Sequence, residues 1–219
     1  FSESYFYFFN MLEKSNYYLN KVINTHGEKL SRKALRKVMN PAGPGNIADG
    51  GFFEYFEQLV EKYGMVPREA MPDTKSAQNT GLLVEDLRNE AGRTAIELRN
   101  KIEEFQAVSP KLTDAQLQSL YDIKNESMKR VYKILVAHLG NPPQEFEYRS
   151  TDHADTKKAD EAKDNPLQVK PATVKRFTPK SFAQDFVGFK SDEYVIVSSV
   201  PILEQDRYFR VKGLVNAVT

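Results

Sequence analysis

The residues in this chain whose type and spacing could support chemistry begin with an adjacent pair of glycines, Gly50 and Gly51. Because glycine has no Cβ, a second main chain can approach it closely and bond to its amide and carbonyl groups. Phe52 and Phe53 open an apolar pattern of helical period that runs to Tyr63, so the pair stands at the start of a predicted helix. Such a pair can present main chain to an extended peptide, although a simple turn has the same pattern.

Three acidic side chains in the same segment allow a second chemistry. Glu54, Glu57 and Glu61 lie at i, i+3 and i+7, which places three carboxylates along a predicted helix and would permit acid/base hydrolysis. The same spacing is typical of the solvated face of an amphipathic helix, and that is the simpler interpretation.

Histidines give little support for a metal centre. His153 stands close to Asp152 and Asp155, but in a charged, solvated segment without the surrounding contacts that fix metal ligands. His26 and His138 have no ligand spacing around them. We therefore expect neither a metal site nor a cofactor.

Composition narrows the classes of function. The 219 residues are enough to bury a core, as one large domain or two small ones. With 31 basic and 30 acidic residues, no electrostatic signal for nucleic acid or a membrane surface stands out, and no apolar run is long enough to span a bilayer. The chain has no Cys, so it holds no disulfide, no thiolate zinc site and no thiol nucleophile.

The elements that must position these residues are mostly helices. Apolar residues recur with the 3.6-residue period over residues 3–24, 31–38, 52–63, 83–105 and 113–139. The first of these helices is rich in aromatic side chains, which we expect to pack in the core. Its polar opposite face is expected to consist of Glu13, Lys14, Asn20 and Lys21.

Helix ends are marked by recognisable caps and breaks. Gly64 favours the end of the helix that follows the glycine pair. A break at Ser109-Pro110 separates the two long helices, and Thr113 with Gln116 forms a capping-box pattern at the start of the second. The short link between them predicts a helical hairpin.

The last third of the chain has a different character. Residues 150–176 alternate in charge with almost no apolar content, so we expect an exposed loop. Thr178-Pro179 predicts a helix start, and residues 194–200 and 208–211 are strand candidates.

Several motifs occur together in a characteristic order. The glycine pair is followed by a helix that ends in Tyr63-Gly64 and by an extended stretch to Pro67. Further matching stretches are residues 1–6 with 13–16, 61–67, 139–143 with 146–149, and 178–179 with Phe182. Together they resemble the papain superfamily, in which a Gly-Gly pair lines the substrate groove, and more narrowly its bleomycin hydrolase and aminopeptidase C branch.

This resemblance implies a fold and a domain order. We expect a predominantly helical α+β protein, part of a papain-like fold with a hook-like helical hairpin insertion and the start of the β-rich lobe. Residues 1–79 would form part of the helical lobe, 80–143 the hairpin, 144–176 a charged loop, and 177–219 a helix and strands that lead to the β-rich lobe.

The resemblance also implies a function that the chain cannot perform alone. The family's catalytic Cys would lie before Phe1 and its His and Asn beyond Thr219, so we expect an internal part of a cysteine aminopeptidase that is inactive by itself. Gly50 and Gly51 would pair with a peptide substrate, and Phe52 and Phe53 would shape an apolar subsite. The family commonly has Gln-Trp-Asp after the pair, where this chain has Phe-Phe-Glu, which leaves the subsite preference and catalytic competence open.

Partners and location follow from the same resemblance. It implies a homohexamer, assembled through the hairpin, and a cytoplasmic location, while the balanced composition indicates no membrane or nucleic-acid partner. The alternative is a non-catalytic helical module whose aromatic helices and charged segment bind another protein.

Overall fold

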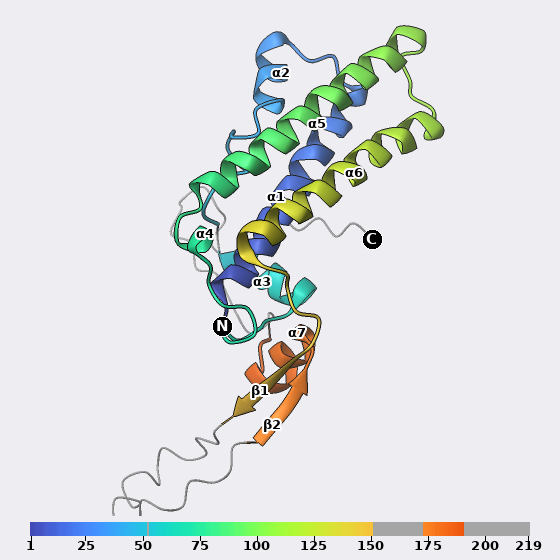
Figure 1. Ribbon diagram of the computed structural model, residues 1–219. Helices are drawn as coiled ribbons and strands as arrows, with labels where there is room; N and C mark the ends of the chain where they lie inside the picture. The colour runs from blue at the N-terminus through green and yellow to red at the C-terminus, as the bar shows by residue number, and fades with distance from the viewer. Residues whose placement is uncertain (52, 151–172, 191–219) are drawn as a thin grey trace, which may run out of the picture.

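The structure of the protein is a computed structural model that describes residues 1–51, 53–150 and 173–190. Helices make up most of these residues, and the sheet has two strands (Figure 1). The predicted α+β class with predominant helix is confirmed.

Three long helices form the body of the molecule. These are α1 (Glu3–Ile23), α5 (Gly81–Val108) and α6 (Asp114–Leu139), which lie side by side (Figure 1). The side of α1 that faces α5 and α6 is apolar and buried, as the sequence period predicts. The largest side chains buried in this core include Phe8, Met11, Tyr18, Leu19, Leu87, Leu98, Leu120 and Leu135.

In the helical hairpin, α5 ends and α6 begins where the sequence indicates. Ser109 stops α5, and the side chain of Thr113 caps α6 by accepting from the amide of Gln116, which in turn accepts from the amide of Thr113. Gly140 ends α6 with a φ of 87°. The predicted hairpin and its capping box are therefore confirmed, while its role in assembly stays a prediction.

The expected polar face of α1 is wrong for two of its four residues. Glu13 and Lys14 are only 3% and 4% exposed. At this position α1 is covered by α3 (Phe53–Tyr63) and by the chain before it, so a charged side chain cannot reach solvent. Lys62 Nζ lies 2.7 Å from Glu13 Oε1, and the ring of Tyr63 stacks on that of Phe9, which fixes α3 against α1.

Shorter helices complete the helical part. They are η1 (Asn24–Gly27), α2 (Arg32–Val38) and α4 (Lys75–Gln78). The sequence predicts α2, which Ser31 caps by accepting a hydrogen bond from the amide of Ala34.

A β-hairpin lies beyond α6, where an exposed loop was expected. The strands β1 (Phe146–Ser150) and β2 (Thr173–Phe177) pair antiparallel, with Phe146 opposite Phe177. The expectation of an irregular segment over 144–176 is therefore wrong at both of its ends. Each strand has only five residues, and each is stabilised by a partner that is distant in the sequence.

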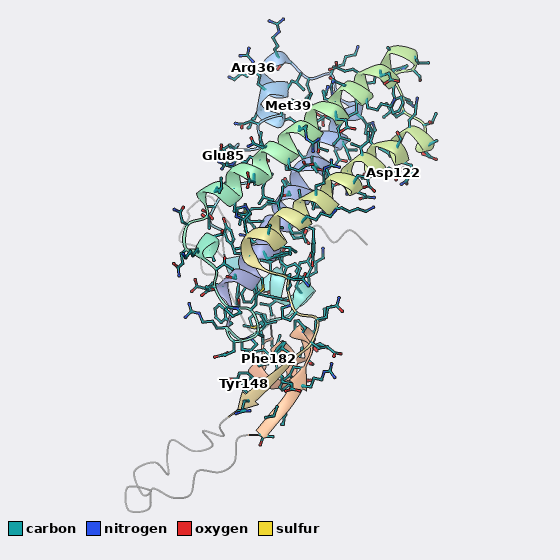
Figure 2. All side chains as sticks on the ribbon, viewed as in Figure 1. Arg36, Met39, Glu85, Asp122, Tyr148 and Phe182 are labelled. Atoms are coloured by element: carbon teal, nitrogen blue, oxygen red, sulfur yellow. The ribbon has the colours of Figure 1, made fainter. Side chains whose placement is uncertain are left out.

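Aromatic side chains anchor this hairpin to the rest of the molecule. After Thr178, which caps as predicted, come one helical turn, α7 (Pro179–Ser181), and a π-helical segment, η3 (Phe182–Val187). The ring of Phe182 lies 5.2 Å from that of Tyr148, and both side chains are labelled where β1 meets η3 (Figure 2). Phe182 is 4% exposed, so it holds the β-hairpin, α7 and η3 together.

Some expectations fall outside the described residues. These are the strands at 194–200 and 208–211 and the surroundings of His153. Within the described ranges, no helix is long and apolar enough to cross a membrane.

Candidate functional site

The loop that leads to the glycine pair is fixed by side chains from three directions. Asn46 donates from its Nδ2 to the carbonyl of Asn40 at 2.7 Å, and Lys21 Nζ lies 3.3 Å from Asn46 Oδ1. Arg88 of α5 donates from its Nε to the carbonyl of Ile47 at 2.7 Å. The chain therefore approaches the glycines along a defined path.

Lys14 binds the main chain of the glycine segment directly. Its ammonium group, buried beneath the loop, donates to the carbonyls of Ala48 and Gly50, each at 2.5 Å. Burial lowers the pKa of Lys14, and the negative charge of Asp49 opposes that change. The sequence pattern placed Lys14 on a solvated face, so periodicity alone missed this contact.

Asp49 holds the other side of the same segment. The Tyr7 hydroxyl donates to its Oδ1 at 2.6 Å, and the Thr80 hydroxyl donates to its Oδ2. Burial raises the pKa of Asp49, but hydrogen bonds from Thr80, Tyr7 and the Gly50 amide, together with the charge of Lys14, outweigh that effect and leave the pKa below its ordinary value. Asp49 is therefore a stable anion that complements the ammonium group.

The two glycines have different surroundings. Gly50 has a φ of +83°, which a residue with a side chain rarely adopts, and its carbonyl accepts a hydrogen bond from Lys14. Gly51 is exposed, and a Cβ built there would lie 3.3 Å from Cδ2 of Tyr55. The geometry therefore gives Gly50 a conformational role and leaves Gly51 facing outward.

A hollow of about 290 Å³ opens beside Gly51 between α1 and α3. Most of its lining is apolar or aromatic, which suits an uncharged side chain of a ligand. The lining residues are Phe1, Glu3, Phe6, Tyr7, Asn10, Gly51, Tyr55, Phe56, Leu59 and Ala77.

Two of the proposed site residues cannot be placed in this hollow. Phe52 lies outside the described residues, and Phe53 begins α3 but its side chain is not described. Tyr55 and Phe56 line the hollow instead, one helical turn further along. The helical period of α3 therefore predicted that this helix forms an apolar wall of the hollow, but it did not identify which residues form that wall.

The remaining candidates are the glutamates of α3, considered for acid/base chemistry, and the possible metal ligands. Glu57 is half-buried and Glu61 exposed on α3. Among the residues that the structure describes, no three His, Cys, Asp or Glu side chains are grouped so that they could hold a metal ion.

His138 has partners that its sequence neighbourhood does not indicate. Its Nε2 lies 3.0 Å from Oδ2 of Asp86, and its Nδ1 lies 3.2 Å from Oγ of Ser76. The Thr74 hydroxyl donates to the His138 carbonyl at 2.7 Å. These contacts join α4, α5 and α6, so His138 connects the hairpin to the segment that follows α3.

The arrangement of the helices and the glycine segment matches one family of peptidases. The model of the Peptidase C1-like family matches residues 1–219, and the chain belongs to this family. This confirms the resemblance to the papain-like peptidases and to their aminopeptidase C and bleomycin hydrolase branch.

Named relatives support the same branch. The chain is 30% identical to aminopeptidase C of Listeria monocytogenes over 225 residues, which cover 99% of this chain and 43% of that protein. It is 29% identical to bleomycin hydrolase of Rattus norvegicus over 157 residues, 69% of this chain and 32% of that protein. The chain therefore spans less than half the length of the curated relatives that it matches.

A solved structure agrees with the fold. The crystal structure of PepW from Lactobacillus rhamnosis HN001 superposes with a TM-score of 0.65 and 28% sequence identity, over 89% of this chain and 37% of that one. The described part thus has the architecture of one portion of a larger papain-like protein.

Proposed function

We propose that this chain is the substrate-binding, central part of a cysteine-type aminopeptidase. Family membership and the aminopeptidase names of its relatives support a peptidase. The exposed main chain of Gly51, beside an apolar hollow, supports a role in binding an extended peptide. This juxtaposition is the observation on which the proposal depends.

The proposed reaction needs a thiol, which these 219 residues do not contain. A Cys thiolate attacks the carbonyl carbon of the first peptide bond, and an imidazolium gives its proton to the departing amine. Water then hydrolyses the thioester and releases the N-terminal residue. The chain has no Cys, so a thiol from elsewhere in the parent protein must supply the nucleophile.

In this proposal the two glycines have different roles in substrate binding. Gly51 pairs with the peptide main chain as a neighbouring strand would, while Gly50 allows the backbone turn that exposes it. The side chain of the bound residue would enter the hollow lined by Tyr55 and Phe56. If Phe52 and Phe53 also contribute to this subsite, they do so from the start of α3.

Replacement of Gly51 tests the proposal. Gly51→Val in the full-length protein places a branched side chain where the peptide should lie, and we expect kcat/KM for an aminoacyl fluorogenic substrate to fall by about 100-fold. Folding should persist, because Gly51 does not need a left-handed conformation and the nearest atom to a new Cβ belongs to the Tyr55 side chain. Circular dichroism and thermal melting provide the check on folding.

Gly43→Ala is the control for a glycine that lies in the same loop but away from the hollow. Its added Cβ would lie 3.2 Å from atoms of Asn40 and Asn46, so it measures how far a change in the loop lowers kcat/KM without a side chain at Gly51. A Gly51→Val protein that folds and turns over substrate at the normal rate would exclude the pairing role.

The alternative function is a non-catalytic helical interaction module. Labelling of the native protein with a peptidyl thiol-reactive inhibitor separates the two, since only the peptidase carries an activated Cys. Mass spectrometry of the product should give a parent well above 25.1 kDa. A protein of 25.1 kDa that takes no label would contradict the peptidase proposal. A hexamer assembled through the hairpin and a cytoplasmic location are proposals from family membership alone.

A further inference from the structure

We propose that Lys14 is a positioning residue for peptide binding, because its ammonium group holds the carbonyls of Ala48 and Gly50 so that the main chain of Gly51 faces the hollow. This inference rests on the proposed function of the glycine segment. Nothing in the motifs of the chain assigns such a role to Lys14. It arises from contacts across 34 and 36 residues of sequence.

The geometry of the contact is specific to main chain. Two carbonyls that are two residues apart converge on one nitrogen, at 2.5 Å each, so the backbone between them must bend around the ammonium group. An ammonium group offers three donors and can hold both carbonyls at once. A neutral apolar side chain of the same length would fill the space but leave both carbonyls without this donor.

The opposite side of the segment is held by an anion. The Asp49 carboxylate takes hydrogen bonds from the hydroxyls of Tyr7 and Thr80. The peptide group between Gly50 and Gly51 is held at its oxygen by Lys14. The Gly51 amide belongs to the same planar trans group and points away from that carbonyl, so fixing the carbonyl gives the amide a defined direction.

Burial of the Lys14 charge lowers the stability of the fold, and packing alone does not explain why a charged residue occupies this position. A buried ammonium group that bonds only to carbonyls loses much of its hydration, and an apolar side chain would avoid that loss. Lys14 is 4% exposed, and its hydrogen bonds go to the main-chain carbonyls of Ala48 and Gly50. A function that needs these carbonyls in place accounts for the charge.

The chain contains a natural control in Lys124. It is also 4% exposed, and its Nζ donates to Oδ1 of Asn20 at 2.9 Å, which joins α6 to α1. Lys124 thus matches Lys14 in residue type and burial, but it donates to a side chain and not to the main chain of the glycine segment.

The inference predicts a change in substrate binding that is separate from stability. In the full-length protein, we expect Lys14→Met to raise KM for a dipeptidyl or aminoacyl fluorogenic substrate by about 10-fold and to change kcat by less than about 2-fold. This pattern follows because pairing with Gly51 is made equally in the bound substrate and in the transition state. Lys14→Arg, which keeps the charge and several donors but not the shape of the ammonium group, should restore KM only in part, and Lys124→Met should leave it unchanged.

Amide hydrogen exchange gives a second measurement that does not require activity. Lys14→Met should speed exchange in a peptide that covers residues 46–51 by about 10-fold or more, while exchange in α5 stays the same. Lys124→Met should not affect residues 46–51. If Lys14→Met does not fold, Lys14→Arg serves for both measurements, with an intermediate KM expected.

Each result decides between the two proposals. A wild-type protein that does not hydrolyse the substrate would refute the proposed function, while exchange would still test the hold of Lys14 on the loop. A normal KM and normal exchange in the Lys14 variants would overturn the inference. An equal rise of KM in Lys14→Met and Lys124→Met would also overturn it, since the effect would then reflect stability alone.

Discussion

At the scale of single residues, two glycines in this protein disfavour a side chain for different reasons. Gly64 ends α3 with a φ of +80°, and a Cβ there would lie 2.2 Å from the carbonyl carbon of Pro179. The next amide, that of Met65, donates to the Pro179 carbonyl at 2.9 Å. Gly64 thus combines a left-handed conformation with close contact between two backbones. Gly140 has a similar φ of +87° but no atom within 4 Å of a built Cβ.

This difference predicts unequal effects of the same substitution. Gly140→Ala should lower the free energy of unfolding by about 1–3 kcal/mol from its backbone conformation alone, because a φ of 87° with a ψ of 170° is a region that essentially only glycine adopts. Gly64→Ala adds a clash with backbone that cannot rotate away, and we expect a loss of more than about 3 kcal/mol. Urea denaturation of the two variants measures both values. Equal losses of unfolding free energy would mean that α7 can shift away from Gly64 at little cost in free energy.

Lys14 shows that the burial of a charged residue also depends on its surroundings in the fold. A pattern that is correct for the aromatic face of α1 assigned Lys14 and Glu13 to solvent, yet both are buried. The tests of Lys14 and of Gly51 belong to this scale, since each concerns one contact with the main chain.

At the scale of elements, a buried carboxylate joins the two long helices of the hairpin. Glu90 of α5 accepts from Nε of Arg130 at 2.8 Å and from the hydroxyl of Ser127 at 3.0 Å, both on α6. Arg93 on α5 also donates to it. Burial raises the pKa of Glu90, but the hydrogen bonds from Arg93, Arg130 and Ser127 outweigh that effect and leave the pKa below its ordinary value.

A lowered pKa in the folded state makes the stability of the hairpin depend on pH. Between the folded pKa and the unfolded value of about 4.3, the unfolded state binds more protons. The stabilisation is therefore present above about pH 4.3 and is lost as the pH falls through the folded pKa. The size should stay below about 1 kcal/mol, because the arginine partners are largely exposed and solvent screens their charges.

Glu90→Gln should remove this dependence. The difference in unfolding free energy between the wild type and the variant, measured in urea, should be largest near pH 7 and shrink toward pH 3. Glu103→Gln is the control, because its partner Arg99 lies on the same helix and the Glu103 side chain is 56% exposed. A difference that does not change with pH would refute the linkage.

At the scale of the whole molecule, two hydrophobic clusters stabilise different parts. The larger lies between α1, α5 and α6. The smaller joins α1 and α3 to η3, and aromatic rings of the β-hairpin pack against it. Its buried members are Phe6, Leu59, Val60, Met65, Phe182 and Ala183.

Phe182 is the residue on which the second cluster depends most. Phe182→Ala removes a ring that is 4% exposed and contacts Phe146, Tyr148 and Phe177, so we expect a loss of about 3–5 kcal/mol. Phe186 stacks on Phe182 but is 44% exposed, and Phe186→Ala should cost about 1 kcal/mol. Hydrogen exchange should rise in β1 and β2 of the Phe182 variant while α5 and α6 stay protected. Uniform loss of protection would contradict two separate clusters.

Much of the fold could be predicted from local patterns. The boundaries of α1, α2, α3, α5 and α6 follow from apolar periodicity and caps, because these signals lie within a few residues of each helix end. The strands at 146–150 and 173–177 were not predicted, since each is short and gains its stability from the other. The partners of His138 were also missed, because Asp86 and Ser76 lie 52 and 62 residues away.

By itself, the sequence determined where α1, α2, α3, α5 and α6 begin and end, that two glycines precede α3, and that no thiol lies within these 219 residues. The tertiary structure decided that Lys14 is buried, that the carbonyl of Gly50 is bonded to Lys14, and that Gly51 faces outward. These three outcomes depend on contacts between α1, α5 and the loop before α3. Such contacts form only when segments far apart in the chain pack together, so no local pattern of residues contains them.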